Sequence, residues 1–301
     1  MSQIVAASPH VTTKNSTAVI MRDVLIALLP AVLAGCVVFG LRALLVVAVT
    51  TAACVFFEWG FEKLCHKPST ISDLSAAVTG VLLAMNLPVS IPLWQAVFGA
   101  LVAIVAVKGL FGGIGKNFAN PAITARIVMF LAFSKTMTAW VFPDAVSSAT
   151  PLAMMANGES VDYLTLLLGN HGGCLGETSA LALLIGFAYL LIRGVISWHT
   201  PVCFVGTVFV MSLILGQDAV GQILSGGLML GAIFMATDYS TTPSTNLGRV
   251  LFGIGAGLLT VLIRFYGAYA EGVSFAILFM NILTPYLSKW TETKPFGGVA
   301  A

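Results

Sequence analysis

Charged residues are scarce in this chain. They make up 9% of its 301 residues, and 58% of the chain is hydrophobic. An ordinary soluble domain carries about 25% charged residues, so the composition argues against a soluble globular protein. Apolar runs of about 17 to 22 residues recur along the whole length, as expected for helices that cross a hydrocarbon core roughly 30 Å thick. The sequence therefore predicts an all-α polytopic membrane protein, and the alternating pattern of a transmembrane barrel is absent.

Two other features are missing from the sequence. The cysteines never form a C-x-x-C pair, which removes the usual basis for an iron–sulfur or zinc site within this chain. The residues before the first apolar run are polar, so we expect no cleavable signal peptide. We therefore predict no metal site, and we expect the lipid bilayer rather than a nucleic acid as a partner.

We expect about ten membrane-spanning helices. The apolar runs lie at about 20–40, 43–61, 71–87, 93–110, 122–142, 178–196, 202–215, 220–236, 247–266 and 272–287. A short polar arm at 1–19 precedes a single membrane domain at 20–290, and a tail follows at 291–301. The longest polar interval, roughly 143–177, separates the fifth run from the sixth and is predicted to lie outside the membrane.

The basic residues are distributed unevenly across these spans. Ten spans put both termini on one side, and placing that side in the cytoplasm assigns eleven of the 14 Lys and Arg residues to the inner face. This bias is the positive-inside pattern of a bacterial inner-membrane protein. No Lys or Arg occurs between Lys135 and Arg193, so Thr150 is predicted to face outward. The same topology puts Arg126 near the inner face and Glu177 near the outer face.

Two short similarities indicate an internal repeat. Residues 72–76 before the third run resemble 176–180 before the sixth, and Asn120-Pro121 resembles Thr242-Pro243. An odd number of spans separates the first pair and an even number the second, so one two-fold operation cannot relate both. We predict an inverted five-plus-five repeat, an arrangement that commonly places broken helices and ligands near the midplane. The carboxylates in the first pair stand at helix starts, where the helix dipole favours an anion, so we interpret them as caps.

A cluster of hydroxyl side chains lies in the long polar interval. The hydroxyls belong to Ser147, Ser148 and Thr150 and follow the carboxylate of Asp144; these four residues and Ala149 form the cluster. Pro151 holds Thr150 in a turn, and its small neighbours would let a modifying enzyme reach the hydroxyl. Composition also allows a simpler interpretation, in which a solvent loop supplies a Ser/Thr cap for a helix that starts near Pro151.

A second candidate site follows the fourth run. The glycines at 112, 113 and 115 permit close backbone approach to a ligand, and Asn117 and Asn120 could present amides to a flat polar ring. The alternative is a plain turn with Asn120 as the N-cap before Pro121.

The chain resembles the D subunit of the Rnf complex, an ion-translocating ferredoxin:NAD⁺ oxidoreductase. The resemblance covers nearly the whole length. It rests on Ser8-Pro9-His10, Met21-Arg22-Asp23-Val24, Asn120-Pro121-Ala122, Thr150-Pro151-Leu152, Gly176-Glu177-Thr178-Ser179-Ala180, Ala236-Thr237-Asp238 and the stretch from Glu271 to Asn281. The cluster at 144–150 also resembles the signature at which flavin transferases attach FMN to threonine, with Ser148 where that signature usually has glycine. The related B subunit of the Na⁺-translocating NADH:quinone reductase shares this signature but has a longer amino-terminal extension.

The resemblance implies a flavin-carrying electron relay. FMN would be joined through a phosphoester to Thr150 on the outer side, with Asp144, Ser147, Ser148 and Ala149 recognised by the flavin transferase. A second, noncovalent flavin such as riboflavin would be a candidate ligand for Asn117 and Asn120. The implied partners are the other Rnf subunits (A, B, C, E and G), especially the FMN-bearing G subunit. The coupling ion would be Na⁺ or H⁺, and no complete active site is expected on this chain alone.

Two other classes of function stay open on the residues alone. The predicted repeat and the amides at span edges would suit a channel or solute transporter. A redox-inactive scaffold for catalytic partners would need no site at all.

Overall fold

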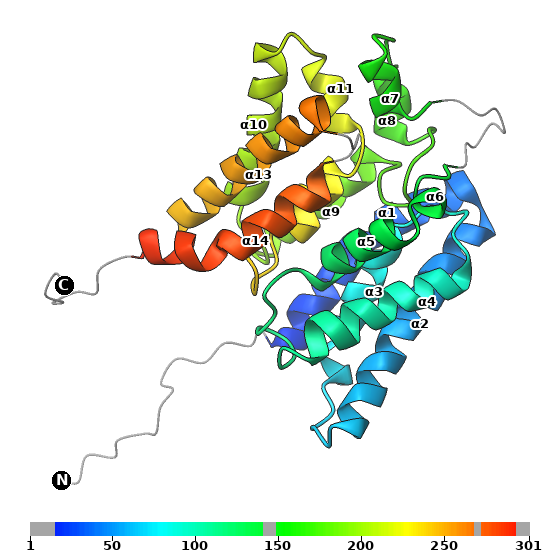
Figure 1. Cartoon of the computed structure of the whole chain (residues 1–301), viewed down its shortest axis with the longest axis vertical. Coiled ribbons are helices and arrows are strands. Elements are labelled where there is room, and N and C mark those ends of the chain that lie inside the picture. The colour runs from blue at the N-terminus through cyan, green and yellow to red at the C-terminus, as the bar shows by residue number, and fades with distance from the viewer. Residues whose placement is uncertain (1–15, 141–148, 268–271, 293–301) are drawn as a thin grey trace, which may run out of the picture.

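The computed structural model describes residues 16–140, 149–267 and 272–292, which form helices and connecting loops with no strand among them. Figure 1 shows the helices as a bundle with α7 and α8 at one end. The prediction of an all-helical fold is confirmed for this part of the chain.

Three helices are long and apolar enough to cross a membrane: α1 (Thr17–Phe39), α2 (Leu41–Leu64) and α13 (Asn246–Tyr266). They have 23, 24 and 21 residues, and about 20 residues span a hydrocarbon core of roughly 30 Å. Large apolar side chains such as Leu33 and Val37 point outward from α1. Such exposure is expected of a surface that faces lipid.

Three further segments have 16 to 18 residues. They are α10 (His199–Ile214), α14 (Val273–Trp290) and the continuous pair formed by α4 (Leu93–Leu101) and the π-helix η2 (Val102–Gly109). A π-helical stretch is rare and is frequently found at a functional site. This one positions Lys108 in the interior.

The other apolar helices are too short to cross a membrane alone. They are α3 (Ser75–Met85), α5 (Pro121–Ala132), α9 (Ala180–Ile192) and α12 (Leu228–Leu230), which continues as the π-helix η3 (Gly231–Met235). Each supplies one or more turns to the core and then stops. Their ends bring polar groups into the bundle.

Buried asparagines mark two of these helix ends. Asn86 follows the last residue of α3, and Asn120 precedes the first residue of α5; they are 1% and 4% exposed. The Asn120 side chain accepts hydrogen bonds from the backbone N–H groups of Ala122 and Ile123 at 3.0 and 3.3 Å. Asn120 is therefore an N-cap, as one of the two interpretations of the sequence requires. Broken helices of this kind place ligand sites inside membrane proteins.

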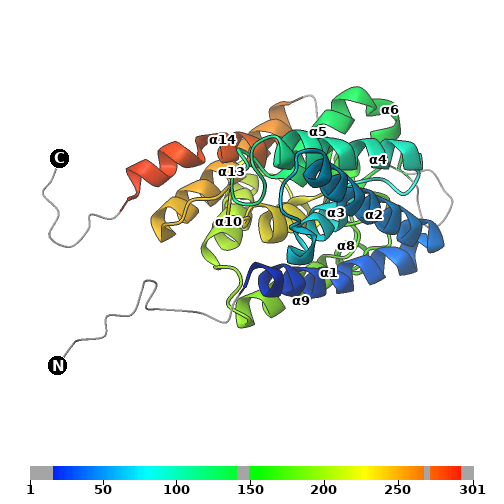
Figure 2. The ribbon, with the colours of Figure 1, turned by 90° about the horizontal axis from the view of Figure 1, so that it is seen from below.

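Five short elements complete the described chain: η1 (Ile71–Asp73), α6 (Ser134–Met137), α7 (Pro151–Ala156), α8 (Tyr163–Leu168) and α11 (Ala219–Leu224). Helices α7, α8 and α11 lie together at one end of the bundle in Figure 1. Helices α1 and α13 begin, and α14 ends, toward the other end (Figures 1 and 2).

Packing pairs bring together segments that are distant in the sequence. Helix α1 packs on α9, and α5 packs on α14, while α2 packs on α3 and α4 and α10 packs on α13. Figure 2 shows α1 and α9 side by side. Their close approach requires Gly186, because a Cβ at this position would lie 2.3 Å from the backbone oxygen of Ala27. Small residues allow this kind of contact between membrane helices.

Every expected apolar run coincides with a helical segment, although several segments are shorter than a complete span. The number of spans and the five-plus-five repeat therefore stay predictions. Most of the predicted arm and tail, residues 1–15 and 293–301, lies outside the described chain.

Candidate functional site

Thr150 is the residue that precedes helix α7. Its Oγ1 accepts a hydrogen bond from the backbone N–H of Ala153 at 3.4 Å, and Pro151 is the first residue of the helix. Thr150 is thus an N-cap, as the simpler interpretation of this cluster expects. Ala149 is exposed. Outside the described residues lie Asp144, Ser147 and Ser148.

Thr150 borders a cavity of about 200 Å³, the Thr150 cavity. Its aromatic walls are Phe130, Trp140 and Phe275. The cavity also carries the polar side chains of Arg126, Thr138, His171, Glu177 and Ser274. Apolar and aromatic walls with a few convergent polar groups are typical of a small-molecule or cofactor site.

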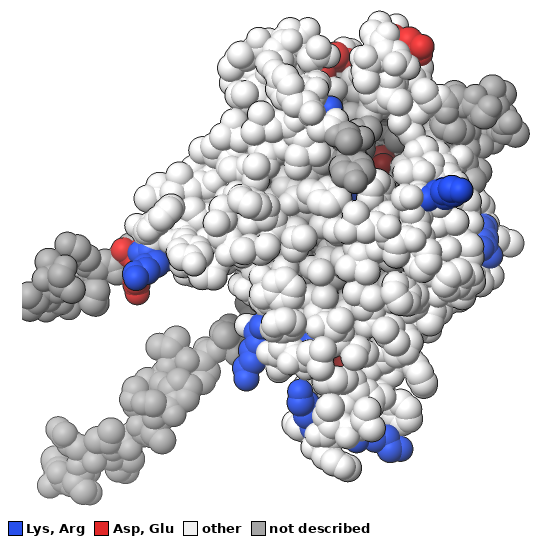
Figure 3. Space-filling view, viewed as in Figure 1, with Lys and Arg blue, Asp and Glu red and all other residues white. Residues whose placement is uncertain are grey.

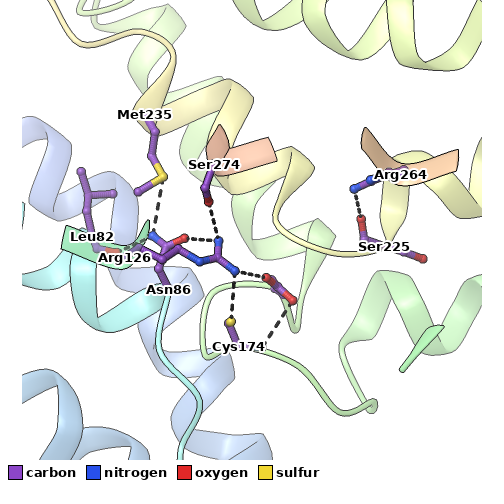
Figure 4. Close-up of polar contacts among 9 residues, drawn as sticks. Leu82, Asn86, Arg126, Cys174, Ser225, Met235, Arg264 and Ser274 are labelled. Atoms are coloured by element: carbon purple, nitrogen blue, oxygen red, sulfur yellow. Dashed lines mark hydrogen bonds and ion pairs between the residues drawn. The ribbon is translucent and has the colours of Figure 1, made fainter. Parts of the chain in front are cut away.

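A buried ion pair forms part of the wall of the Thr150 cavity. Arg126, from α5, and Glu177, from the loop before α9, are 6% and 8% exposed, and Arg126 Nη2 lies 3.4 Å from Glu177 Oε1. The same Nη2 lies 3.6 Å from Cys174 Sγ. Arg126 Nη1 donates to Asn86 Oδ1 at 2.8 Å and to Ser274 Oγ at 3.1 Å (Figure 4). The guanidinium is therefore fixed from both sides.

Hydrogen bonds continue from Arg126 into the centre of the bundle. Asn86 Nδ2 donates to the backbone oxygen of Leu82 at 2.7 Å and lies 3.6 Å from Met235 Sδ. Asn120 Nδ2 in turn donates to the backbone oxygen of Met235 at 3.4 Å. These contacts join the ends of α3, η3 and α5. Because buried polar groups need partners, the network holds the broken helices in register.

His171 is the third ionisable residue in the wall of the Thr150 cavity. The side chain is 8% exposed, and Nδ1 lies 3.2 Å from the backbone oxygen of Gly172. Burial lowers the pKa of His171, and hydrogen bonds to the backbone of Gly172 and Thr178 only partly offset that effect. The imidazole is therefore neutral at pH 7.

A second cavity of about 90 Å³, the Asn117 cavity, lies between α1, α3, η2 and the chain after η3. Both Asn117 and Asn120 line it, as do Lys108, Asp238 and Tyr239. Asn117 Oδ1 is buried and has no hydrogen-bond partner. A buried amide oxygen without a partner is costly, so this atom is suited to accept a hydrogen bond from a ligand.

Lys108 makes the other buried ion pair of the described chain. It is 4% exposed and pairs with Glu58 of α2, which is 5% exposed. Lys108 Nζ also donates to Ser75 Oγ at 2.6 Å. Sequence reasoning missed this pair, since its members are 50 positions apart on different predicted spans. The only available signal was the presence of an acid and a base inside apolar runs.

Two sequence predictions about charged residues are wrong. Arg126 and Glu177 were assigned to opposite faces, but they form an ion pair. The assignment failed because α5 begins in the interior rather than at a membrane surface. Glu177 is also not a helix cap, since Ser179 caps α9 and the Glu177 carboxylate contacts Arg126. By contrast, Asp73 Oδ1 accepts a hydrogen bond at 2.8 Å from the backbone N–H of Ser75, the first residue of α3, although Leu74 occupies the N-cap position.

Comparison with known proteins gives a family for this architecture. The profile described as the NQR2, RnfD, RnfE family matches residues 4–297. The chain belongs to this family. The match includes Thr150, Arg126 and Glu177 of the first cavity and Asn117 and Asn120 of the second.

Three named proteins are similar to this chain, and each is the D subunit of a complex. The D subunit of the Na⁺-translocating ferredoxin:NAD⁺ oxidoreductase complex of Acetobacterium woodii is 46% identical over 301 residues. The alignment covers 97% of this chain and 95% of that protein. The D subunit of the proton-translocating ferredoxin:NAD⁺ oxidoreductase complex of Clostridium ljungdahlii is 39% identical. The alignment covers 97% of this chain and 96% of that protein. The D subunit of the ion-translocating oxidoreductase complex of Halorhodospira halophila is 34% identical. The alignment covers 99% of this chain and 96% of that protein. The family resemblance drawn from the sequence is confirmed.

Proposed function

We propose that this chain is the membrane subunit of an ion-translocating ferredoxin:NAD⁺ oxidoreductase complex and relays electrons through FMN attached to Thr150. The observation that carries the proposal is the position of Thr150 at the edge of a cavity with aromatic and charged walls. The names of the relatives support the kind of complex.

The residues around Thr150 fit a tethered flavin. A phosphoester at Oγ1 would hold the group at the cavity edge, and Trp140, Phe130 and Phe275 offer apolar surface to a flat ring. FMN supplies one-electron chemistry when bound, so the chain needs neither a general base nor a substrate pocket. The contributions of the protein are to hold the ring, exclude water and place fixed charges beside it.

The proposed attachment also requires a maturation enzyme. A flavin transferase would recognise Asp144, Ser147, Ser148 and Ala149 and deliver FMN to Thr150. Ala149 is exposed, so the described part of this segment is accessible. The electron would then pass between the FMN-bearing G subunit and the rest of the complex, whose other members are the A, B, C and E subunits.

The coupling ion is Na⁺ or H⁺. The relative from Acetobacterium woodii is named Na⁺-translocating, and the one from Clostridium ljungdahlii is named proton-translocating. Both cover most of this chain, so family membership does not select the ion. We propose ion translocation as a property of the assembled complex.

A second, noncovalent flavin such as riboflavin is proposed for the Asn117 cavity. The supporting observation is Asn117 Oδ1, a buried acceptor with no partner on a residue that lines this cavity. The cavity measures about 90 Å³, so entry of a ring requires the exposed side chains of Ile114 and Tyr239 at its border to move. Asn120 is already engaged as an N-cap, and it would contribute mainly by fixing the wall.

The proposed topology is that of an inner-membrane protein with both termini in the cytoplasm and Thr150 outside. In its support, acidic atoms occur at the end of the bundle that carries α7 and α8, and basic atoms are frequent at the opposite end (Figure 3). The packing also supports a five-plus-five repeat. The pairs α2–α3 and α2–α4 correspond to α10–α11 and α10–α13, while α1–α9 and α5–α14 connect the halves. This correspondence relates α3 to the α11–α12–η3 segment rather than to α9, so the two sequence similarities do not define the register.

The test of the covalent flavin is in-gel fluorescence after denaturation. The complex is expressed in cells that contain the flavin transferase, with Thr150→Val as the variant and Thr138→Val as the control, since Thr138 borders the same cavity. We expect a fluorescent band at the mass of this chain in the parent and the control, and none in Thr150→Val. A dark band from the parent would favour a transporter or scaffold instead.

A further inference from the structure

We propose that Arg126 and Glu177 set, with opposite signs, the potential at which the group on Thr150 accepts an electron. The inference rests on the proposed function, because it requires a redox group in the Thr150 cavity. It concerns two residues outside the attachment cluster, and it assigns to each residue the direction in which it shifts that potential.

Both charges lie in the wall of the cavity that Thr150 opens onto. Arg126 and Glu177 are buried, at 6% and 8% exposure, so water screens their fields only weakly. Of the described side chains in this wall, His171 is neutral at pH 7 because burial lowers its pKa. Arg126 and Glu177 are therefore the charged side chains among the described residues that line the cavity.

Hydrogen bonds hold both charges firmly in place. Asn86 and Ser274 accept hydrogen bonds from one arm of the Arg126 guanidinium at 2.8 and 3.1 Å. Glu177 is held by that arginine and, through Oε2, by the backbone N–H of Cys174 at 3.4 Å. Figure 4 shows these contacts converging from α3, α5, α14 and the loop before α9. Fixed charges of this kind act without reorganising when an electron arrives.

The proposed step is the transfer of one electron to the group on Thr150. A one-electron donor, which is a flavin-bearing partner protein under the proposed function, is oxidised, and the group on Thr150 is reduced by one electron. No bond forms or breaks, and Arg126 and Glu177 exchange no proton. The cavity gains one negative charge. A nearby positive charge stabilises the reduced state and a nearby negative charge destabilises it.

The direction in which each substitution shifts the reduction potential follows from the charge that it removes. Arg126→Gln removes the positive charge and should disfavour reduction. Glu177→Gln removes the negative charge and should favour reduction. At one fixed applied potential, we expect the ratio of reduced to oxidised group to fall about tenfold in the first variant and to rise about tenfold in the second. A tenfold change in a one-electron equilibrium corresponds to about 59 mV.

The experiment is a spectroelectrochemical titration of the assembled complex. Each sample is first checked by in-gel fluorescence for flavin on this chain. Arg126→Lys is the matched control, because it keeps the charge while losing the fork of hydrogen bonds. We expect it to titrate close to the parent. A purely structural role for the pair would move all three variants in the same direction, and that result would overturn the proposal.

The outcomes separate the inference from the function on which it rests. If the parent chain shows no flavin fluorescence, the proposed function fails. If the flavin is present and Arg126→Gln and Glu177→Gln leave its potential unchanged, the inference fails and the function stands. If Arg126→Gln does not assemble, Glu177→Gln decides alone, since only an upward shift agrees with the proposal.

Discussion

Removing one partner of the buried Lys108–Glu58 pair should destabilise the bundle strongly. Both residues are nearly inaccessible, at 4% and 5% exposure. In Lys108→Met, Glu58 would lose its only cationic partner among the described contacts, and Glu58 Oε2 already has no hydrogen-bond partner. A charge buried without compensation is expensive, so the variant tests whether the pair is formed as the structure shows.

The expected magnitude follows from the burial of the pair. Breaking a buried ion pair by removing one partner costs about 3–5 kcal/mol, whereas replacing both partners by apolar residues of similar volume is often neutral. A loss of about 4 kcal/mol changes the unfolding equilibrium by roughly a thousandfold. The double variant Lys108→Met with Glu58→Met should recover most of this loss. Ser75 keeps a partner in both variants, because its hydroxyl also contacts Asp73.

The assay is a detergent unfolding titration of the purified protein in mixed micelles, followed by tryptophan fluorescence. The parent, the two single variants and the double variant form a cycle that isolates the interaction between the two residues. A coupling free energy of about 2 kcal/mol or more is expected. If the loss in the double variant equals the sum of the two single losses, the coupling free energy is zero and the reasoning from burial is refuted.

Two further predictions concern packing and the central polar network. Gly186→Ala should cost about 1–3 kcal/mol by overpacking, because its Cβ would lie 2.3 Å from the Ala27 backbone oxygen. The matched control is Gly206→Ala, whose Cβ would have no atom within 4 Å, and it should be neutral or stabilising by up to about 1 kcal/mol. The same unfolding titration compares the two variants. Asn86→Leu removes the acceptor 2.8 Å from Arg126 Nη1 and should cost about 1–3 kcal/mol; an unchanged unfolding midpoint would show that this hydrogen bond does not stabilise the bundle.

The general architecture could be predicted because it depends on composition and on runs of apolar residues. The scarcity of charge predicted a helical membrane protein, and the described chain is all-helical with three helices long enough to span. The capping role of Asn120 was also readable, because an Asn-Pro pair at a helix start has a local cause. These features need no knowledge of distant contacts.

The site could be predicted only in part, because its walls come from several elements. Thr150 was found through its local cluster, but nothing in the sequence joined it to Arg126, which lies 24 positions earlier in a short helix. Hydropathy assumes that a helix begins at a membrane surface, and α5 instead begins beside buried Asn120. That single difference explains why Arg126 was assigned to the face opposite Glu177, although the two residues form an ion pair. The Lys108–Glu58 pair was not predicted for a related reason, since contacts between helices leave no periodic signal in the sequence.

Peptide mass mapping of the assembled, active complex tests the central claim most directly. We predict that the fragment containing Thr150 carries the mass of an FMN phosphoester, and that the corresponding fragment of Thr150→Val does not. Recovery of the unmodified Thr150 fragment from an active complex would contradict the proposed attachment.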